Sequence, residues 1–188
     1  MSSLGEEKSG GFEVRLYTLG HSTRSLAELV ALLKAFQVEA LADIRRWPRS
    51  KRVPYFNLES LSEHLPRAGI EYLWLGEELG GYRRQGLSED SPNKAWRSPG
   101  FRNYADYTLT SAFATGVERF LRLAEVKPLA YMCAEKLPWR CHRTIVSDYL
   151  TTKGYEVVHI IDTEQAVEHK LPSFAKVEAG RLTYPPRD

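Results

Sequence analysis

The sequence has little of what marks secreted or membrane proteins. Only two of its 188 residues are cysteine, which is too few for the disulfide framework of a small secreted domain. No apolar run approaches the roughly 18 residues of a transmembrane helix, so we expect no membrane association. The first eleven residues lack the basic and then apolar pattern of a signal peptide, and we therefore expect a cytoplasmic protein.

A large net charge is also absent. The 26 basic and 24 acidic residues leave a formal charge of +2. The whole molecule is therefore not a polycation, and any anion must bind at a local basic patch. The apolar fraction of 43% and the charged fraction of 27% are ordinary for a globular domain. We expect a single α/β domain over residues 13–188 and a disordered tail over residues 1–12.

Short apolar runs alternate with segments of helical periodicity. The runs that predict strands are residues 14–19, 38–44, 70–75, 128–133 and 155–161. The segments that predict helices are residues 25–36, 58–67, 101–125 and 140–153. This alternation predicts a three-layer, mostly parallel sheet with crossover helices, a Rossmann-like arrangement, and residues 174–184 predict a C-terminal hairpin. Residues 76–100 are polar and too long for a simple connection, which is typical of functional or mobile loops.

Ligands of parallel α/β sheets bind outside the carboxyl ends of the strands. The first candidates for a site are therefore the residues that follow the predicted strands. These are Gly20–Thr23, Asp43–Arg46, Gly76 with Leu79–Gly81, and Cys133–Glu135. Imidazole, carboxylate, guanidinium and thiol groups thus gather at one edge of the predicted sheet, which indicates a reactive site there.

Several of these segments resemble the bacterial and archaeal family called domain of unknown function 488. The residues that carry the resemblance are Gly20–Ser22, Asp43–Arg45, Pro48–Ser50, Phe56–Asn57, Arg102–Tyr107, Cys133–Glu135, Cys141–Arg143, Phe174–Val177 and Arg181–Tyr184. The resemblance extends from Tyr17 to Tyr184, and its most specific element is Cys-Ala-Glu followed by Cys-His-Arg. It implies the fold and the place of the site, and it implies no reaction.

Cys133 ends a predicted strand and precedes a short loop and a helix. A thiol in such a turn can face backbone N–H groups and a helix N-terminus, which lower its pKa and yield a nucleophilic thiolate. We therefore expect Cys133 to be an accessible nucleophile, with Glu135 orienting a partner and Cys141 packed behind it. The alternative is a buried, inert cysteine at a strand end.

The proton carrier of such a reaction would be His21 or His142, because histidine titrates near neutral pH. Asp43 lies inside an apolar run, where a carboxylate is costly unless it is paired. Two roles are open for Asp43: a catalytic one, or a salt bridge that fixes the loop, with Arg45 as a natural partner.

A basic segment follows Asp43. Residues 45–52 contain five basic side chains and no acidic one, and aromatic residues interleave with them. Basic and aromatic side chains together suit phosphate binding and base stacking, although a solvated loop is the alternative. We expect Arg45, Arg49 and Arg143 to bind an anionic substrate, with Ser22 beside them.

Two functions follow from these observations. The first is a small enzyme, a hydrolase or transferase with a cysteine nucleophile, that acts on a phosphate-bearing substrate such as a nucleotide or nucleic acid. The second is a nucleic-acid-binding module, or a redox- or zinc-responsive regulatory module, without catalysis. We expect no cofactor, but zinc stays open because Cys133, Cys141, His142 and His21 formally make a tetrahedral set. The sequence has no Cys-x2-Cys spacing in its favour.

Overall fold

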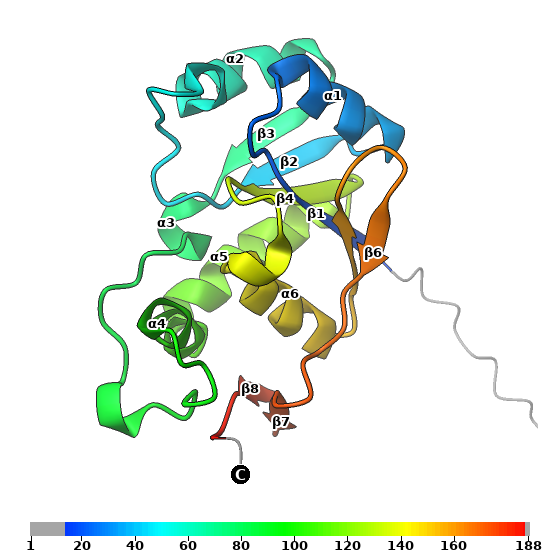
Figure 1. Ribbon diagram of the computed structural model, residues 1–188. Helices are drawn as coiled ribbons and strands as arrows, with labels where there is room; N and C mark the ends of the chain where they lie inside the picture. The colour runs from blue at the N-terminus through cyan, green and yellow to red at the C-terminus, as the bar shows by residue number, and fades with distance from the viewer. Residues whose placement is uncertain (1–13, 187–188) are drawn as a thin grey trace, which may run out of the picture.

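The computed structural model describes residues 14–186, and within them six strands form one sheet (Figure 1). The parallel strands are β1 (Arg15–Gly20), β2 (Ala40–Asp43), β3 (Glu71–Trp74), β4 (Leu129–Cys133) and β5 (Glu156–Ile160). They lie in the order β3-β2-β4-β1-β5, and the antiparallel strand β6 (Ala166–Glu168) extends the β5 edge. The mostly parallel α/β sheet confirms the predicted fold class. The expected tail over residues 1–12 lies outside the described residues.

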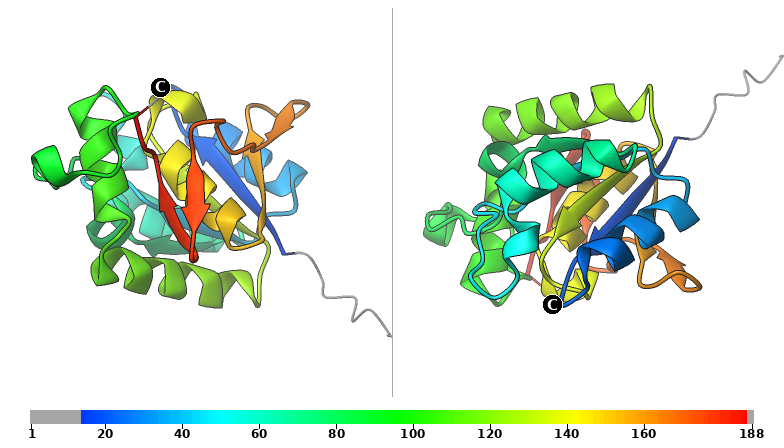
Figure 2. Two further views of the ribbon diagram at one scale, coloured as in Figure 1. Left: turned by 90° about the horizontal axis from the view of Figure 1, so that it is seen from below. Right: turned by 90° about the horizontal axis from the view of Figure 1, so that it is seen from above.

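Helices cover both faces of the sheet (Figures 1 and 2). One face carries α1 (Leu26–Ala35) and α2 (Leu58–Arg67), whose leucines pack with Leu19 and Leu41 of the sheet. The helices of the other face are α3 (Gly76–Leu79), α4 (Pro99–Tyr107), α5 (Ser111–Ala124) and α6 (Arg143–Thr152). The three layers therefore enclose two apolar cores, one on each side of the sheet. None of the helices among residues 14–186 is both long and apolar enough to cross a membrane.

Local sequence explains where two of these helices begin. Ser25 caps α1 with the predicted capping box, because its hydroxyl accepts from the Glu28 N–H and the Glu28 carboxylate accepts from the Ser25 N–H. Helix α6 starts three residues later than the sequence suggests. Pro138 opens a short 3-10 turn, η3 (Pro138–Arg140), and Cys141 after it has extended backbone. Cys141 and His142 therefore precede the helix instead of forming its first turn.

The C-terminal residues form the predicted hairpin, β7 (Lys176–Glu178) and β8 (Arg181–Thr183). Ala179 and Gly180 between these strands have φ values of 48° and 74°, which a two-residue hairpin turn requires. The long segment after β3 contains α3 and a short 3-10 helix, η2 (Ser88–Asp90), while η1 (Pro54–Phe56) precedes α2.

The topology sends the loops around the carboxyl end of β4 to opposite faces of the sheet. This strand lies between β1 and β2, whose following loops lead to the α1 and α2 face, whereas the loop after β4 leads to α6 on the opposite face. Gly20 lets the loops after β1 and β4 touch, since a Cβ there would lie 1.8 Å from the Glu135 carbonyl oxygen. The His21 and Ser22 N–H groups donate to the Cys133 and Ala134 carbonyls across this contact.

Candidate functional site

Two sulfurs and one imidazole nitrogen meet at the end of β4. The Sγ atoms of Cys133 and Cys141 and a ring nitrogen of His142 lie within 4.8 Å of one another. Cys133 is partly exposed, Cys141 is buried, and neither forms a disulfide. We call these three residues the thiol–imidazole cluster. Their donor atoms also suit a thiophilic metal ion, since zinc accepts two thiolates and an imidazole.

The ring of His142 is held in one orientation. Its Nε2 lies 3.2 Å from the Ile44 carbonyl oxygen, which can only accept, so Nε2 carries the proton and the neutral ring leaves Nδ1 unprotonated. Nδ1 in turn lies 3.5 Å from Cys141 Sγ. Tyr104 packs edge-on against the ring at 4.9 Å, and a Cβ on Gly81 would lie 3.0 Å from Nδ1. The nitrogen that faces the sulfurs is therefore available as a proton acceptor or a ligand.

The two thiols share a proton unequally. The pKa of Cys141 is lowered to about 7, because the Cys133 thiol donates to it and the positive charge of Arg143 lies close. The pKa of Cys133 is raised to about 12, because Cys141 accepts its proton and burial disfavours a second thiolate. A lowered pKa was expected at Cys133. The structure places it at Cys141, the cysteine that lies next to the N-terminus of α6.

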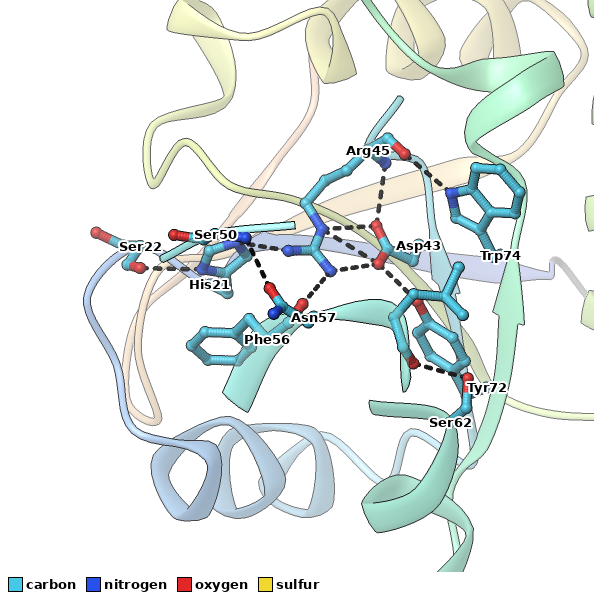
Figure 3. Close-up of polar contacts among 11 residues, drawn as sticks. His21, Ser22, Asp43, Arg45, Ser50, Phe56, Asn57, Ser62, Tyr72 and Trp74 are labelled. Carbon is cyan, nitrogen blue, oxygen red and sulfur yellow. Dashed lines mark hydrogen bonds and ion pairs between the residues drawn. The ribbon is translucent and has the colours of Figure 1, made fainter. Parts of the chain in front are cut away.

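A buried ion pair lies beside this cluster (Figure 3). Asp43 is fully buried and accepts from the backbone N–H, Nε and Nη2 of Arg45, the last at 2.5 Å. The Tyr72 hydroxyl donates to the same carboxylate at 2.7 Å, and burial is the main reason that the pKa of Tyr72 is raised. Arg45 also donates to the Phe56 carbonyl at 2.7 Å. Of the two roles considered for Asp43, the geometry is that of a salt bridge that fixes the loop after β2.

His21 belongs to this ion-pair network. Its Nδ1 lies 2.9 Å from the Ser22 carbonyl oxygen, its Nε2 lies 3.2 Å from Arg45 Nη1, and its ring stacks on Phe56 at 4.2 Å. Burial and the charge of Arg45 lower the pKa of His21 to about 4. His21 is thus a neutral ring with both nitrogens occupied. His142 is the histidine whose free nitrogen faces the thiols.

The three arginines expected to clamp an anion do not converge. Arg143 is fully buried and donates to the Thr18 hydroxyl at 3.0 Å and to the Glu135 and Lys136 carbonyls. Arg49 lies on the surface with 80% of its side chain exposed, and its ion pair with Glu59 measures 3.7 Å. With Arg45 paired to Asp43, the three guanidinium groups have separate sets of partners, and anion binding by them stays a prediction.

Two further expected residues shape the backbone near the cluster. The Glu135 carboxylate accepts from the Leu137 N–H at 3.2 Å, which closes the loop after Cys133. Ser22 has a φ of 50° and accepts from His21 through its carbonyl. The structure thus brings every expected residue except Arg49 to the carboxyl edge of the sheet. The chemical groups there form two adjoining networks, one of thiols and one of ions.

A groove lies near the cluster. It has a volume of about 610 Å³ and is lined by Arg46, Trp47, Tyr82–Leu87, Asp106, Tyr107 and Thr110. Arg46 follows Arg45 in the chain, and Tyr82 follows the glycine that touches His142. This groove therefore lies close to the thiol–imidazole cluster, since Tyr82 of its lining adjoins the Gly81 that contacts His142.

Sequence reasoning did not identify two residues of the site, namely Tyr72 and Tyr104. Tyr72 and Tyr104 fall within predicted elements, where an aromatic residue is most simply interpreted as core. Gly81 was among the candidates at the predicted strand ends, and in the structure it lies against the ring of His142.

Comparison with known proteins adds one finding. The model of the family described as domain of unknown function DUF488 matches residues 25–150, which is more than half of the chain and includes the whole thiol–imidazole cluster. A search of curated proteins and a search of solved structures gave no significant match.

Proposed function

The chain belongs to the family described as domain of unknown function DUF488, and we propose from its site that it is a cysteine-dependent hydrolase or transferase acting on a phosphate-bearing anion. The observation that carries the proposal is the convergence of Cys133, Cys141 and His142 within 4.8 Å at the carboxyl end of β4. Nucleophilic catalysis by cysteine needs the sulfur, a proton acceptor beside it and a group that orients the acceptor. The cluster supplies all three, with the Ile44 carbonyl as the orienting group.

Cys133 is the attacking atom in this proposal because its side chain is the more exposed of the two thiols. Cys141 holds the negative charge near neutral pH and receives the proton of Cys133. His142 Nδ1, at 3.5 Å from Cys141, is the next acceptor. The role that the sequence left open between two histidines therefore goes to His142.

The covalent steps balance without an oxidant. A bond forms between Cys133 Sγ and phosphorus while the bond from phosphorus to the leaving oxygen breaks. The Cys133 proton passes to the Cys141 thiolate and then to the leaving oxygen, which departs as a hydroxyl group. Water or an acceptor alcohol then attacks phosphorus, the sulfur–phosphorus bond breaks, and one proton of the attacking molecule returns to Cys133.

Turnover of 4-nitrophenyl phosphate and bis(4-nitrophenyl) phosphate tests this proposal. Cys133→Ser is expected to lower kcat at least about a thousandfold, as removal of a nucleophile does. His142→Gln is expected to lower it about a hundredfold or more. His64→Gln is the matched control, because His64 is exposed on α2 and outside the cluster. Turnover that survives Cys133→Ser, or its absence from the unaltered protein for both esters, would contradict the proposal.

The second candidate is a metal centre, and the donor set favours it. Two sulfurs and one imidazole nitrogen leave a fourth position for water, as in catalytic zinc sites with two cysteines and one histidine. The contact from His142 Nε2 to the Ile44 carbonyl is the outer hydrogen bond that metal-bound histidines commonly make. Elemental analysis of untreated protein decides between the two. Stoichiometric zinc that is lost in Cys133→Ser and in Cys141→Ser alike would show that Cys133 is a metal ligand and not the nucleophile.

A further inference from the structure

The groove beside the thiol–imidazole cluster carries concentrated positive charge. Arg46, Arg83 and Arg84 line it, and no ion pair engages any of them within the part of the chain that the structure describes. The guanidinium groups of Arg46 and Arg83 donate to backbone carbonyls of Glu77 and its neighbours, which orients them without neutralising them. Three positive charges, two of them oriented by hydrogen bonds, in a chain of net charge +2 form a local anion site.

The one carboxylate of the groove lining, Asp106, accepts hydrogen bonds from neutral groups. Asp106 is 5% exposed, and its oxygens accept from the Ser91 hydroxyl, the Asn93 amide and the Leu87 N–H at 2.6 to 2.8 Å. This carboxylate holds the segment that forms the outer wall of the groove. The lining therefore has three arginines against one carboxylate, which leaves an excess of positive charge in the groove.

Exposed aromatic rings lie in the same groove. Trp47 and Tyr82 are 60% and 80% exposed, and their ring centroids are 5.3 Å apart. Two large aromatic side chains beside the arginines are thus available to a ligand that stacks on them. The third ring, Tyr107, lies under the guanidinium group of Arg83 at 3.6 Å. The groove thus combines stacking surfaces with arginine.

A second group of basic side chains lies on the loop that also carries Arg46 and Trp47. The loop after β2 carries exposed Arg49, Lys51 and Arg52 and lies on the same flank of the molecule as the segment that follows α3 (Figures 1 and 2). Basic side chains are therefore present beyond the lining of the groove itself. A chain of phosphates is the ligand that such an extended basic track would bind.

We propose that this groove binds single-stranded nucleic acid, with bases stacked on Trp47 and Tyr82 and phosphates on Arg46, Arg83 and Arg84. A duplex is a poorer ligand, because its bases are already stacked and cannot reach the two rings. Since Tyr82 lines the groove and the adjoining Gly81 contacts His142, a bound strand would pass close to the thiol–imidazole cluster. The inference rests on the proposed function only in naming that strand as the substrate.

Fluorescence anisotropy of a labelled single strand of about 15 nucleotides, as DNA and as RNA, tests the proposal. We expect binding that weakens with salt, with a slope of log K against log salt of about −2 for three neutralised phosphates of a single strand. The same sequence as a duplex, and AMP as a competitor, are expected to bind at least about tenfold more weakly. Equal binding of duplex or AMP would overturn the assignment to a single strand.

Matched variants locate the binding site. Trp47→Ala is expected to weaken binding about tenfold, while Trp139→Ala, which removes an equally exposed indole outside the groove, is expected to leave it unchanged. Arg84→Ala is expected to reduce the salt slope by about 0.7, whereas Arg122→Ala on exposed α5 surface leaves it unchanged. Equal losses in a groove variant and its control would place binding elsewhere.

The Cys133→Ser protein separates this inference from the proposed function. It is expected to bind the strand with unchanged affinity, because Cys133 is not part of the groove. Absence of strand binding in the unaltered protein, with turnover of the phosphate esters intact, would overturn the inference alone. Strand binding without thiol-dependent turnover would overturn the proposed function alone.

Discussion

Arg45 Nη1 lies 3.2 Å from His21 Nε2, and this contact sets the state of both side chains. The guanidinium can only donate, so His21 Nε2 accepts and its ring stays neutral. The other nitrogens of Arg45 are taken by Asp43 and the Phe56 carbonyl. The sequence suggested that His21 and Arg45 act on the substrate. In the structure these two side chains contact each other, and Arg45 also holds Asp43 and the Phe56 carbonyl.

The Asp43–Arg45 pair is expected to dominate the stability of this edge. Asp43→Asn should lower the free energy of unfolding by about 3 to 5 kcal/mol, because it leaves a buried guanidinium without its charge partner. Arg49→Ala, which breaks the exposed pair with Glu59, should cost about 1 kcal/mol or less. Urea denaturation of both variants measures the difference. A similar loss of unfolding free energy in both variants would show that the buried pair stabilises the protein no more than the exposed pair does.

The sequence predicted the sheet edge well because strand ends are marked locally. Hydrophobic runs that end in Gly20, Asp43 and Cys133 indicate both the strands and the side that holds the loops. The partners of each side chain could not be predicted, since they depend on how β4 enters between β1 and β2. Arg143 illustrates this limit: nothing in its local sequence indicates that Thr18, 125 positions away, accepts its hydrogen bond.

The sequence also did not predict strand β6, nor which of the two cysteines has the lower pKa. Residues of β6 are exposed, so they lack the apolar alternation by which a strand is recognised. Cys133 was expected to have the lower pKa because it ends a strand in front of a helix. The 3-10 turn at Pro138 shifts the start of the helix, and Cys141 is the cysteine next to its N-terminus.

Stability is expected to fall as the pH drops from 7 to 5. Burial lowers the pKa of His21 to about 4 and that of His159 to about 3, against 6.5 in the unfolded chain. Between these values the unfolded state binds more protons, so the free energy of unfolding rises with pH, by at most about 1.4 kcal/mol per unit for each histidine. His159 faces His169 and Arg143, whose positive charge adds to the effect.

Unfolding midpoints at several pH values measure this slope. His159→Gln should reduce the slope between pH 7 and 5, while His64→Gln on the exposed surface of α2 should leave it unchanged. The buried Asp148 acts in the opposite sense, because burial raises the pKa of its carboxyl. A stability that is flat between pH 7 and 5 would contradict the neutral, buried state of both histidines.

Gly81 is expected to be essential for the position of His142. The Cβ of Gly81→Ala would lie 3.0 Å from Nδ1, so the ring must shift away from the Ile44 carbonyl or from Cys141. We expect a loss of ester turnover of about tenfold or more, with a change in stability of about 1 kcal/mol. Gly100→Ala is the control, because its Cβ would meet only the Ser98 hydroxyl at 3.8 Å. Equal turnover in both variants would remove His142 from the mechanism.

Arg143 is expected to support both the loop after Cys133 and the charge on Cys141. Its guanidinium holds the Glu135 and Lys136 carbonyls, and its positive charge lowers the pKa of Cys141. Arg143→Met should therefore destabilise the protein by about 3 kcal/mol or more, because it leaves the buried Thr18 hydroxyl and two partly buried carbonyls without their donor. The pKa of Cys141 should also rise from about 7 toward the ordinary value of a thiol.

The conservative variant separates the two effects of Arg143. Arg143→Lys keeps the charge but loses the planar group that reaches Thr18 and both carbonyls at once. We expect Arg143→Lys to retain much of the lowered Cys141 pKa, followed by thiolate absorbance across pH, while denaturation reports a loss of stability close to that of Arg143→Met. An unchanged thiolate titration in Arg143→Met would show that the proton shared with Cys133 alone keeps Cys141 ionised, and that the arginine acts only through the loop.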